Sequence, residues 1–141
     1  MADMTFVKEG DLLILVHNKT NPTPEAWAAY CQAIKTYLAS GDAVRVLLVV
    51  SEAGGPNAKQ RREVIEAFGS TQPLTAVCSN SALARGITTA IAWLFPKLMM
   101  SYRYEDVVAA LDGLGVPRDK HVGITARVIE LQRKVSAKPF R

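Results

Sequence analysis

The run "AVRVLLVV" at residues 43–50 constrains the fold of this chain more than any other segment. Apart from Ala43 and Arg45, every residue in it is valine or leucine. A strand that is apolar on both faces needs cover on both faces, as in the centre of a sheet with helices packed on it. The run therefore predicts a central strand in an α/β domain.

The segments around this run change between the apolar periods of strands and helices. Residues 4–10 and 11–18 are short apolar runs joined by a polar turn, which is typical of a hairpin. Residues 21–41 have one apolar helical face, with Thr23 as its N-cap and Gly41 as its C-cap. Further helices are predicted at residues 57–69, 81–95, 104–116 and 118–137, and further strands at residues 73–79 and 97–103.

Strands that alternate with helices pair mostly in parallel, through right-handed crossovers. The sequence therefore predicts an α/β fold with a four- or five-stranded, mostly parallel sheet, flanked by helices and followed by an extra C-terminal helix. The length of 141 residues suits one domain, and 49% hydrophobic content suits a globular one. We place this domain at residues 1–116 and a basic C-terminal helix and tail at residues 117–141.

The positive charge of the chain is concentrated in its tail. Residues 118–141 hold seven basic and two acidic residues, which gives +5, so the rest of the chain carries −1 of the net +4. A basic helix can bind nucleic acid or anionic lipid, but a solvated helix face explains the same charges. We favour the solvated face and expect no DNA partner.

The same helix carries a narrow apolar seam, formed by Ile124, Val128, Leu131 and Val135. A seam of this spacing needs a surface to pack on. It either covers a face of its own domain or crosses to a second copy, which would form a symmetric dimer. We expect the second arrangement, a homodimer through this helix.

Two cysteines, Cys31 and Cys78, lie in apolar runs without metal-ligand spacing. They are expected to be buried free thiols in a reducing compartment. No signal peptide is recognisable, and no apolar run approaches the roughly 20 residues that cross a bilayer. We therefore expect a cytoplasmic protein, and membrane association is not expected.

The turn after the central strand, "SEAGGPN" at residues 51–57, is the first candidate site. A helix that begins there could hold an anion at its N-terminus, and Gly54 and Gly55 would let a ligand approach the backbone. Lys59, Arg61 and Arg62 could add positive charge. However, no glycine-rich phosphate motif is present, Glu52 would repel a phosphate, and Asn57 suits an ordinary helix start. A plain connector is favoured over a ligand loop.

The second candidate site is the turn "CSNSALARG" at residues 78–86. Ser79, Asn80 or Ser81 can cap the helix that follows, and capping alone explains them. Ligands of open α/β sheets, however, gather beyond the carboxyl ends of strands, and Arg85 could reach an anion held there. Capping alone and capping combined with a polar pocket both stay open.

No catalytic or metal-binding group can be assembled from the sequence. His17 and His121 lack a second ligand at useful spacing, and no serine has a defensible histidine and aspartate partner. The aromatic residues are better explained as core or partner surface than as a base-stacking platform: Trp27, Trp93, Phe95, Tyr102 and Tyr104. We expect no enzyme, no metal and no cofactor.

The order of elements resembles that of STAS domains, the fold of bacterial anti-sigma-factor antagonists. More narrowly, residues 4–116 resemble the small SpoIIAA-like proteins of that superfamily, some of which are also likened to the lipid-binding Sec14 fold. The likeness rests on the hairpin and on three segments: "VRVLLVV", "AVCSNSALARGITTAIAWLF" and "SYRYEDVVAALDGL". It implies the same fold and a regulatory, non-enzymatic role.

In the regulatory members of that superfamily, the central strand is followed by a turn of the type Asp-Ser-[Ser/Thr]-Gly-Leu. Phosphorylation of its serine releases a partner kinase. The corresponding turn here is "SEAGGP", which has no aspartate before its serine and no Gly-Leu after it. Only Ser51 can be considered as a phosphoacceptor.

These observations favour a non-enzymatic STAS-type regulatory or protein-interaction module with an unidentified protein partner. The alternative is a small-ligand carrier that binds an anion or lipid at the strand-end turns. A cavity lined by Trp27, Ile87, Ile91 and Trp93 would favour the carrier, and a flat closed surface the interaction module. The candidate binding residues are Ser51, Glu52, Gly54, Gly55, Asn57, Ser79, Asn80, Ser81 and Arg85.

Overall fold

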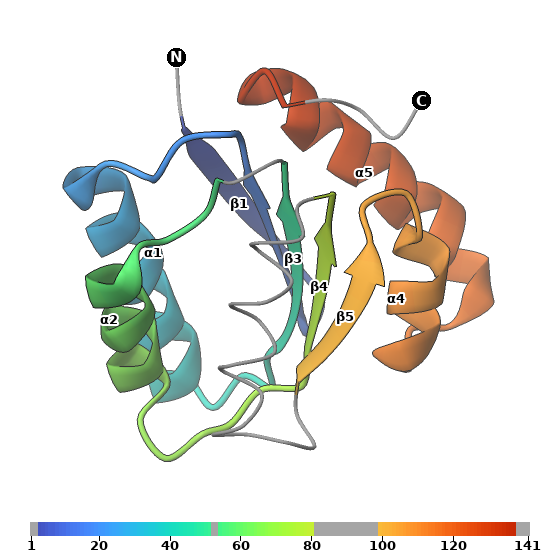
Figure 1. The fold of residues 1–141 in the computed structure, drawn as a ribbon. Coiled ribbons are helices and arrows are strands. Elements are labelled where there is room, and N and C mark those ends of the chain that lie inside the picture. Colours follow the sequence, from blue (N-terminus) through green and yellow to red (C-terminus); the bar gives the residue numbers. More distant parts are fainter. Residues whose placement is uncertain (1–2, 52–53, 81–98, 138–141) are drawn as a thin grey trace.

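The computed structural model describes residues 3–51, 54–80 and 99–137, which form one five-stranded sheet with helices on both faces (Figure 1). The strands lie in the order of the sequence: β1 (Met4–Glu9), β2 (Leu12–His17), β3 (Arg45–Val50), β4 (Thr75–Ser79) and β5 (Met99–Arg103). β1 pairs antiparallel with β2, and every other pair is parallel. The predicted α/β class and mostly parallel sheet are confirmed.

The run that predicts a central strand forms β3, the middle strand of the five. Its side chains alternate between two separate hydrophobic clusters, one on each face of the sheet. Leu47 and Val49 belong to the cluster on one face of the sheet, and Val46 belongs to the cluster on the opposite face. The continuous apolar run is therefore explained by burial on both faces, as predicted.

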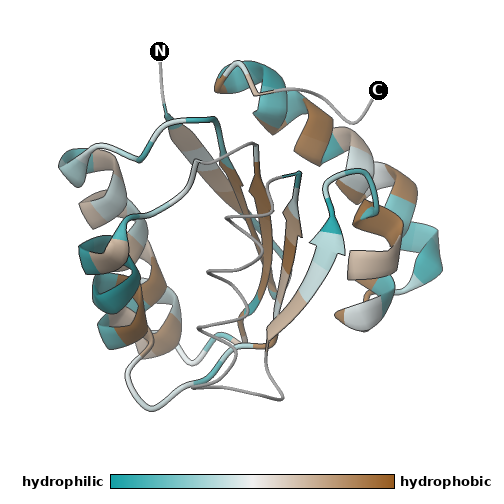
Figure 2. Ribbon diagram, in the orientation of Figure 1, coloured by the Kyte–Doolittle hydropathy of each residue, from teal (hydrophilic) through white to brown (hydrophobic). Residues whose placement is uncertain are grey.

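One face of the sheet is covered by α1 (Pro24–Ala39) and α2 (Ala58–Phe68), which pack against each other. α1 begins as predicted, because the Thr23 hydroxyl accepts the backbone N–H of Ala26 over 3.2 Å. It ends at Ala39, and Gly41 follows with a φ of +78°. Figure 2 shows the hydrophobic sides of both helices turned toward the sheet.

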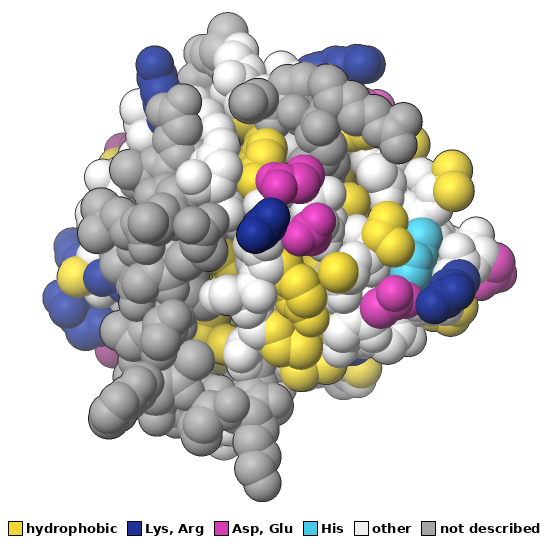
Figure 3. Space-filling view, turned by 45° about the vertical axis from the view of Figure 1, so that its right-hand side comes forward, with side chains coloured by type: hydrophobic (Ala, Val, Ile, Leu, Met, Phe, Trp, Pro, Cys, Tyr) yellow, Lys and Arg dark blue, Asp and Glu magenta, His cyan; other side chains and the backbone are white. Residues whose placement is uncertain are grey.

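The other face is covered by α4 (Val107–Gly113), the short 3₁₀ helix η1 (Arg118–Lys120) and α5 (His121–Lys134). Figure 3 brings the side with β5 and α4 forward and shows hydrophobic side chains gathered there. Met100 and Tyr102 are half-buried on this face, against Gly113 of α4. The helix predicted from residue 104 begins only at Val107, after a turn in which Asp106 N–H donates to the Arg103 carbonyl.

The apolar seam of the C-terminal helix packs on its own domain. Its four residues are buried in the same cluster as Leu12, Ile14 and Val16 of β2: Ile124, Val128, Leu131 and Val135. A single chain therefore satisfies the seam, and the reason for expecting a second copy to cover it is removed. α5 shares one core with the segment before residue 117.

Three further expectations from the sequence concern the cysteines, the helix at residues 81–95 and membrane association. Cys31 and Cys78 are free and buried. The helix predicted at residues 81–95 lies outside the described residues. Within the described ranges, no helix is both long and apolar enough to cross a membrane.

Candidate functional site

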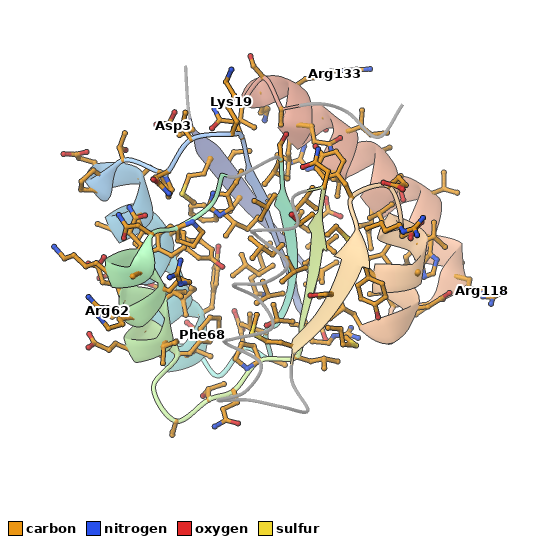
Figure 4. All side chains as sticks on the ribbon, in the orientation of Figure 1. Asp3, Lys19, Arg62, Phe68, Arg118 and Arg133 are labelled. Atoms are coloured by element: carbon orange, nitrogen blue, oxygen red, sulfur yellow. The ribbon has the colours of Figure 1, made fainter. Side chains whose placement is uncertain are left out.

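A pocket of about 170 Å³ lies between α2 and the sheet, among the residues that the structure describes. Strand alternation turns Leu48 and Val50 of β3 and Val77 of β4 toward it. α2 contributes the stripe Val64, Ile65 and Phe68, and α1 contributes Trp27. In Figure 4, Phe68 lies on the side of α2 that faces the sheet, whereas Arg62 points away from it.

The described residues cover the apolar lining of this pocket incompletely. Val64, Ile65 and Phe68 point inward, as the sequence predicts, but they are half-buried, and so is Leu48. On the opposite face, the seam residues Val128 and Leu131 are 0% and 1% exposed. The pocket therefore offers apolar surface that the described residues leave uncovered.

The loop after β3 forms one end of the pocket through Gly54, Gly55 and Pro56. Gly55 is buried with a φ of +96°, a conformation that favours glycine, and the Asn21 side-chain amide donates to its carbonyl over 2.6 Å. The loop is thereby held against the β2–α1 connection. Glu52, predicted as part of this loop site, lies outside the described residues.

The start of α2 is closed by a reciprocal cap. The Asn57 side chain accepts the backbone N–H of Gln60, and the Gln60 side chain accepts the backbone N–H of Asn57, each over 2.9 Å. Two donors at this helix start are therefore bonded within the helix. Asn57 acts as a cap, which supports the connector interpretation for this residue.

Arg61 is the one charged side chain among the described residues that line the pocket. It is half-buried, and its Nη1 donates to the Pro56 carbonyl over 3.0 Å, which places the guanidinium at the loop end of the pocket. In the described part of the chain, no carboxylate lies within ion-pairing distance of it. A cation thus borders a mainly apolar lining, whose polar members include Thr71, Gln72 and Thr75.

Gln60 is a residue that sequence reasoning missed. It is 5% exposed, and its side-chain amide donates to the Pro22 carbonyl over 2.8 Å. Its backbone carbonyl accepts the indole N–H of Trp27 over 2.9 Å. These bonds fix α1 relative to α2 and so hold the pocket wall. The spacing Asn-x-x-Gln, a variant of the capping box, predicts the capping bonds of Gln60 but not these two contacts.

His17 is buried at the end of β2, beside the pocket wall. Its ring centroid lies 6.0 Å from that of Trp27, and neither ring nitrogen has a hydrogen-bond partner among the described residues. Burial lowers the pKa of His17 to about 3, so the ring is neutral at pH 7. No cluster of three metal-ligating side chains occurs among the described residues, so nothing there pairs His17 with a metal.

Ser51 faces the opposite side of the sheet from the pocket. It is 4% exposed, and the Tyr104 hydroxyl bonds both Ser51 and the Gln132 side-chain amide, the latter over 2.9 Å. Burial raises the pKa of Tyr104. A charged group at position 51 would therefore be buried.

The second predicted turn is described only in part. Ser79 is buried and Asn80 exposed, while Ser81 and Arg85 lie outside the described residues, as do the expected cavity residues Ile87, Ile91 and Trp93. Ser79 pairs with Val50 in the register, so the two candidate turns follow adjacent strand ends. Of the predicted binding residues that the structure describes, Gly54 and Gly55 line the pocket, as do Arg61, predicted to add charge, and Trp27, predicted as a cavity residue.

Comparison with known proteins adds no assignment to this geometry. No family model matches the chain, and no match is found among curated proteins.

Proposed function

We propose that this chain is a non-enzymatic binding protein that holds a small apolar ligand in the pocket between α2 and the sheet. The pocket itself is the observation that carries this proposal. Protein interiors are normally packed without voids, and ligand sites are concave and mainly apolar with few polar groups. The lining by Leu48, Val64, Ile65 and Phe68, with Arg61 at one end, has this composition.

The half-buried lining also supplies a driving force. Each square ångström of apolar surface that a ligand removes from water contributes roughly 25 cal/mol. A rigid wall reduces the cost of binding, and the bonds of Gln60 to Pro22 and Trp27 make α1 and α2 such a wall. The two buried free cysteines fit a reducing compartment such as the cytoplasm.

Titration with N-phenyl-1-naphthylamine, a neutral probe whose fluorescence rises in apolar surroundings, tests this proposal. We expect saturable binding to one site and about tenfold weaker binding after Ile65→Trp, which fills the pocket from α2. Val108→Trp is the matched control, because Val108 lies on α4 and is 51% exposed. Absence of saturable binding, or equal binding by both variants, would contradict the proposal.

A second candidate is a regulatory or protein-interaction module of the STAS type. The resemblance of residues 4–116 and the sequential strand order support it. The burial of Ser51 does not favour a phosphorylation switch at that residue. Native mass spectrometry of protein purified from its own source separates the candidates, since a carrier retains a small ligand and an interaction module retains a protein.

A further inference from the structure

We propose that the pocket selects ligands with an anionic oxygen group at one end of an apolar chain, and that Arg61 binds this group. This inference rests on the proposed function, because it assumes that the pocket binds an apolar ligand. It adds a chemical class and a specificity-determining residue.

The position of Arg61 on α2 is the first step. Arg61, Val64, Ile65 and Phe68 follow the spacing i, i+3, i+4 and i+7, so they share one helix face, and all four line the pocket. Arginine thus takes the place that an apolar residue would fill at the start of the stripe. Glu63 and Glu66 of the same helix are exposed and do not line the pocket.

The second step is the state of the guanidinium group. Arginine stays charged at any ordinary pH and carries five N–H donors. One of the donors bonds Pro56, which fixes the side chain, and within the described ranges no carboxylate neutralises its charge. A half-buried cation gains most from an anionic oxygen acceptor, since charge-assisted hydrogen bonds are about twice as strong as neutral ones.

The third step is the choice between the helix start and Arg61 as the anion site. The cap formed by Asn57 and Gln60 uses two donors at the start of α2. Arg61 keeps donors available at the same end of the pocket. Either a carboxylate or a lipid phosphate would satisfy this chemistry.

Calorimetric titration with decanoate, decanol and decyl phosphate tests the inference, each below the concentration at which the chains aggregate. We expect wild-type protein to bind decanoate or decyl phosphate about tenfold more tightly than decanol. Arg61→Gln should remove this preference by weakening the binding of both anions far more than that of decanol, and retained decanol binding reports that the variant is folded. Arg62→Gln, on the exposed side of α2, is the matched control and should bind all three like wild type.

The outcomes separate the two proposals. If decanol binds as tightly as both anions, or if Arg61→Gln keeps the preference, the inference is overturned while the pocket stands. If none of the three compounds binds, the proposed function fails, and the inference fails with it. Tighter binding of decyl phosphate than decanoate supports a phosphate head group, and the reverse order supports a free carboxylic acid.

Discussion

Gly54 lies so close to Asn18 that a β-carbon at position 54 would overlap the Asn18 carbonyl oxygen. The Gly54 N–H donates to the Ser51 carbonyl over 3.1 Å, so the loop folds back on the end of β3. Gly55 follows with a φ of +96°, and a β-carbon there would meet little crowding, since the nearest atom to it would be a Val50 methyl at 3.4 Å. The two adjacent glycines are therefore required for different physical reasons.

We predict that Gly54→Ala lowers the free energy of unfolding by about 3 kcal/mol or more, because backbone atoms must move to admit a methyl group. Gly55→Ala should cost only about 1–2 kcal/mol, the strain of a non-glycine residue at positive φ. Urea denaturation measures both. Gly123→Ala in α5 is the control, because nothing lies near that position, and it should stabilise by about 0.5–1 kcal/mol. Equal effects at positions 54 and 55 would contradict the structure.

The sheet could be predicted because its signals are local. The run around Leu47 has no surroundings that satisfy it except cover on both faces. The placement of α5 could not be predicted, because the seam at Val128 and Leu131 shows only that a surface is needed. Whether that surface belongs to the same chain depends on the direction in which the chain leaves Val116.

The pocket could be predicted from the sequence less well than the sheet, for a related reason. The turn at Gly54 and Gly55 could be found from strand and helix boundaries. Strand parity, however, decides which face each side chain takes, and it sends Ser51 away from the pocket while Val50 lines it. The role of Gln60 depends on its contacts with Pro22 and Trp27, which no local pattern contains.

The burial of His17 in its neutral form predicts that the fold loses stability in acid. Its pKa is about 3 in the folded state and 6.5 in an unfolded chain, so the unfolded state binds the proton first as the pH falls. Its contribution to stability is fully present above pH 6.5 and is lost progressively between pH 6.5 and pH 3. At up to roughly 1.4 kcal/mol per pH unit, the loss between pH 6.5 and 4.5 is about 2 kcal/mol.

The comparison that isolates this effect is His17→Phe, which keeps an aromatic ring and removes the proton site. Unfolding by urea at several pH values should show a shallower acid dependence for the variant than for wild type. Carboxylates contribute equally to both proteins, so only the difference between the curves concerns His17. Parallel curves would mean that His17 is protonated, or exposed to water, in the folded protein.

The packing of α5 predicts that the C-terminal helix stabilises a single chain. Leu131 is 1% exposed in the core, so Leu131→Ala should cost about 2–5 kcal/mol in thermal or urea unfolding. Val122→Ala on the same helix is the control, because Val122 is 82% exposed, and it should change stability by less than about 0.5 kcal/mol. Similar small effects of both changes would show that α5 does not pack on the sheet.

Ser51→Asp tests whether position 51 tolerates charge. A carboxylate there would be buried beside the Tyr104 hydroxyl, and burial of an unpaired charge costs several kcal/mol, so we expect a large loss of stability in urea. Ser51→Ala should cost only about 1 kcal/mol, since it removes one neutral hydrogen bond. Ser70→Asp, at an exposed position after α2, should be nearly neutral. If Ser51→Asp proved as stable as Ser70→Asp, Ser51 would be accessible, and phosphorylation there would again explain the turn.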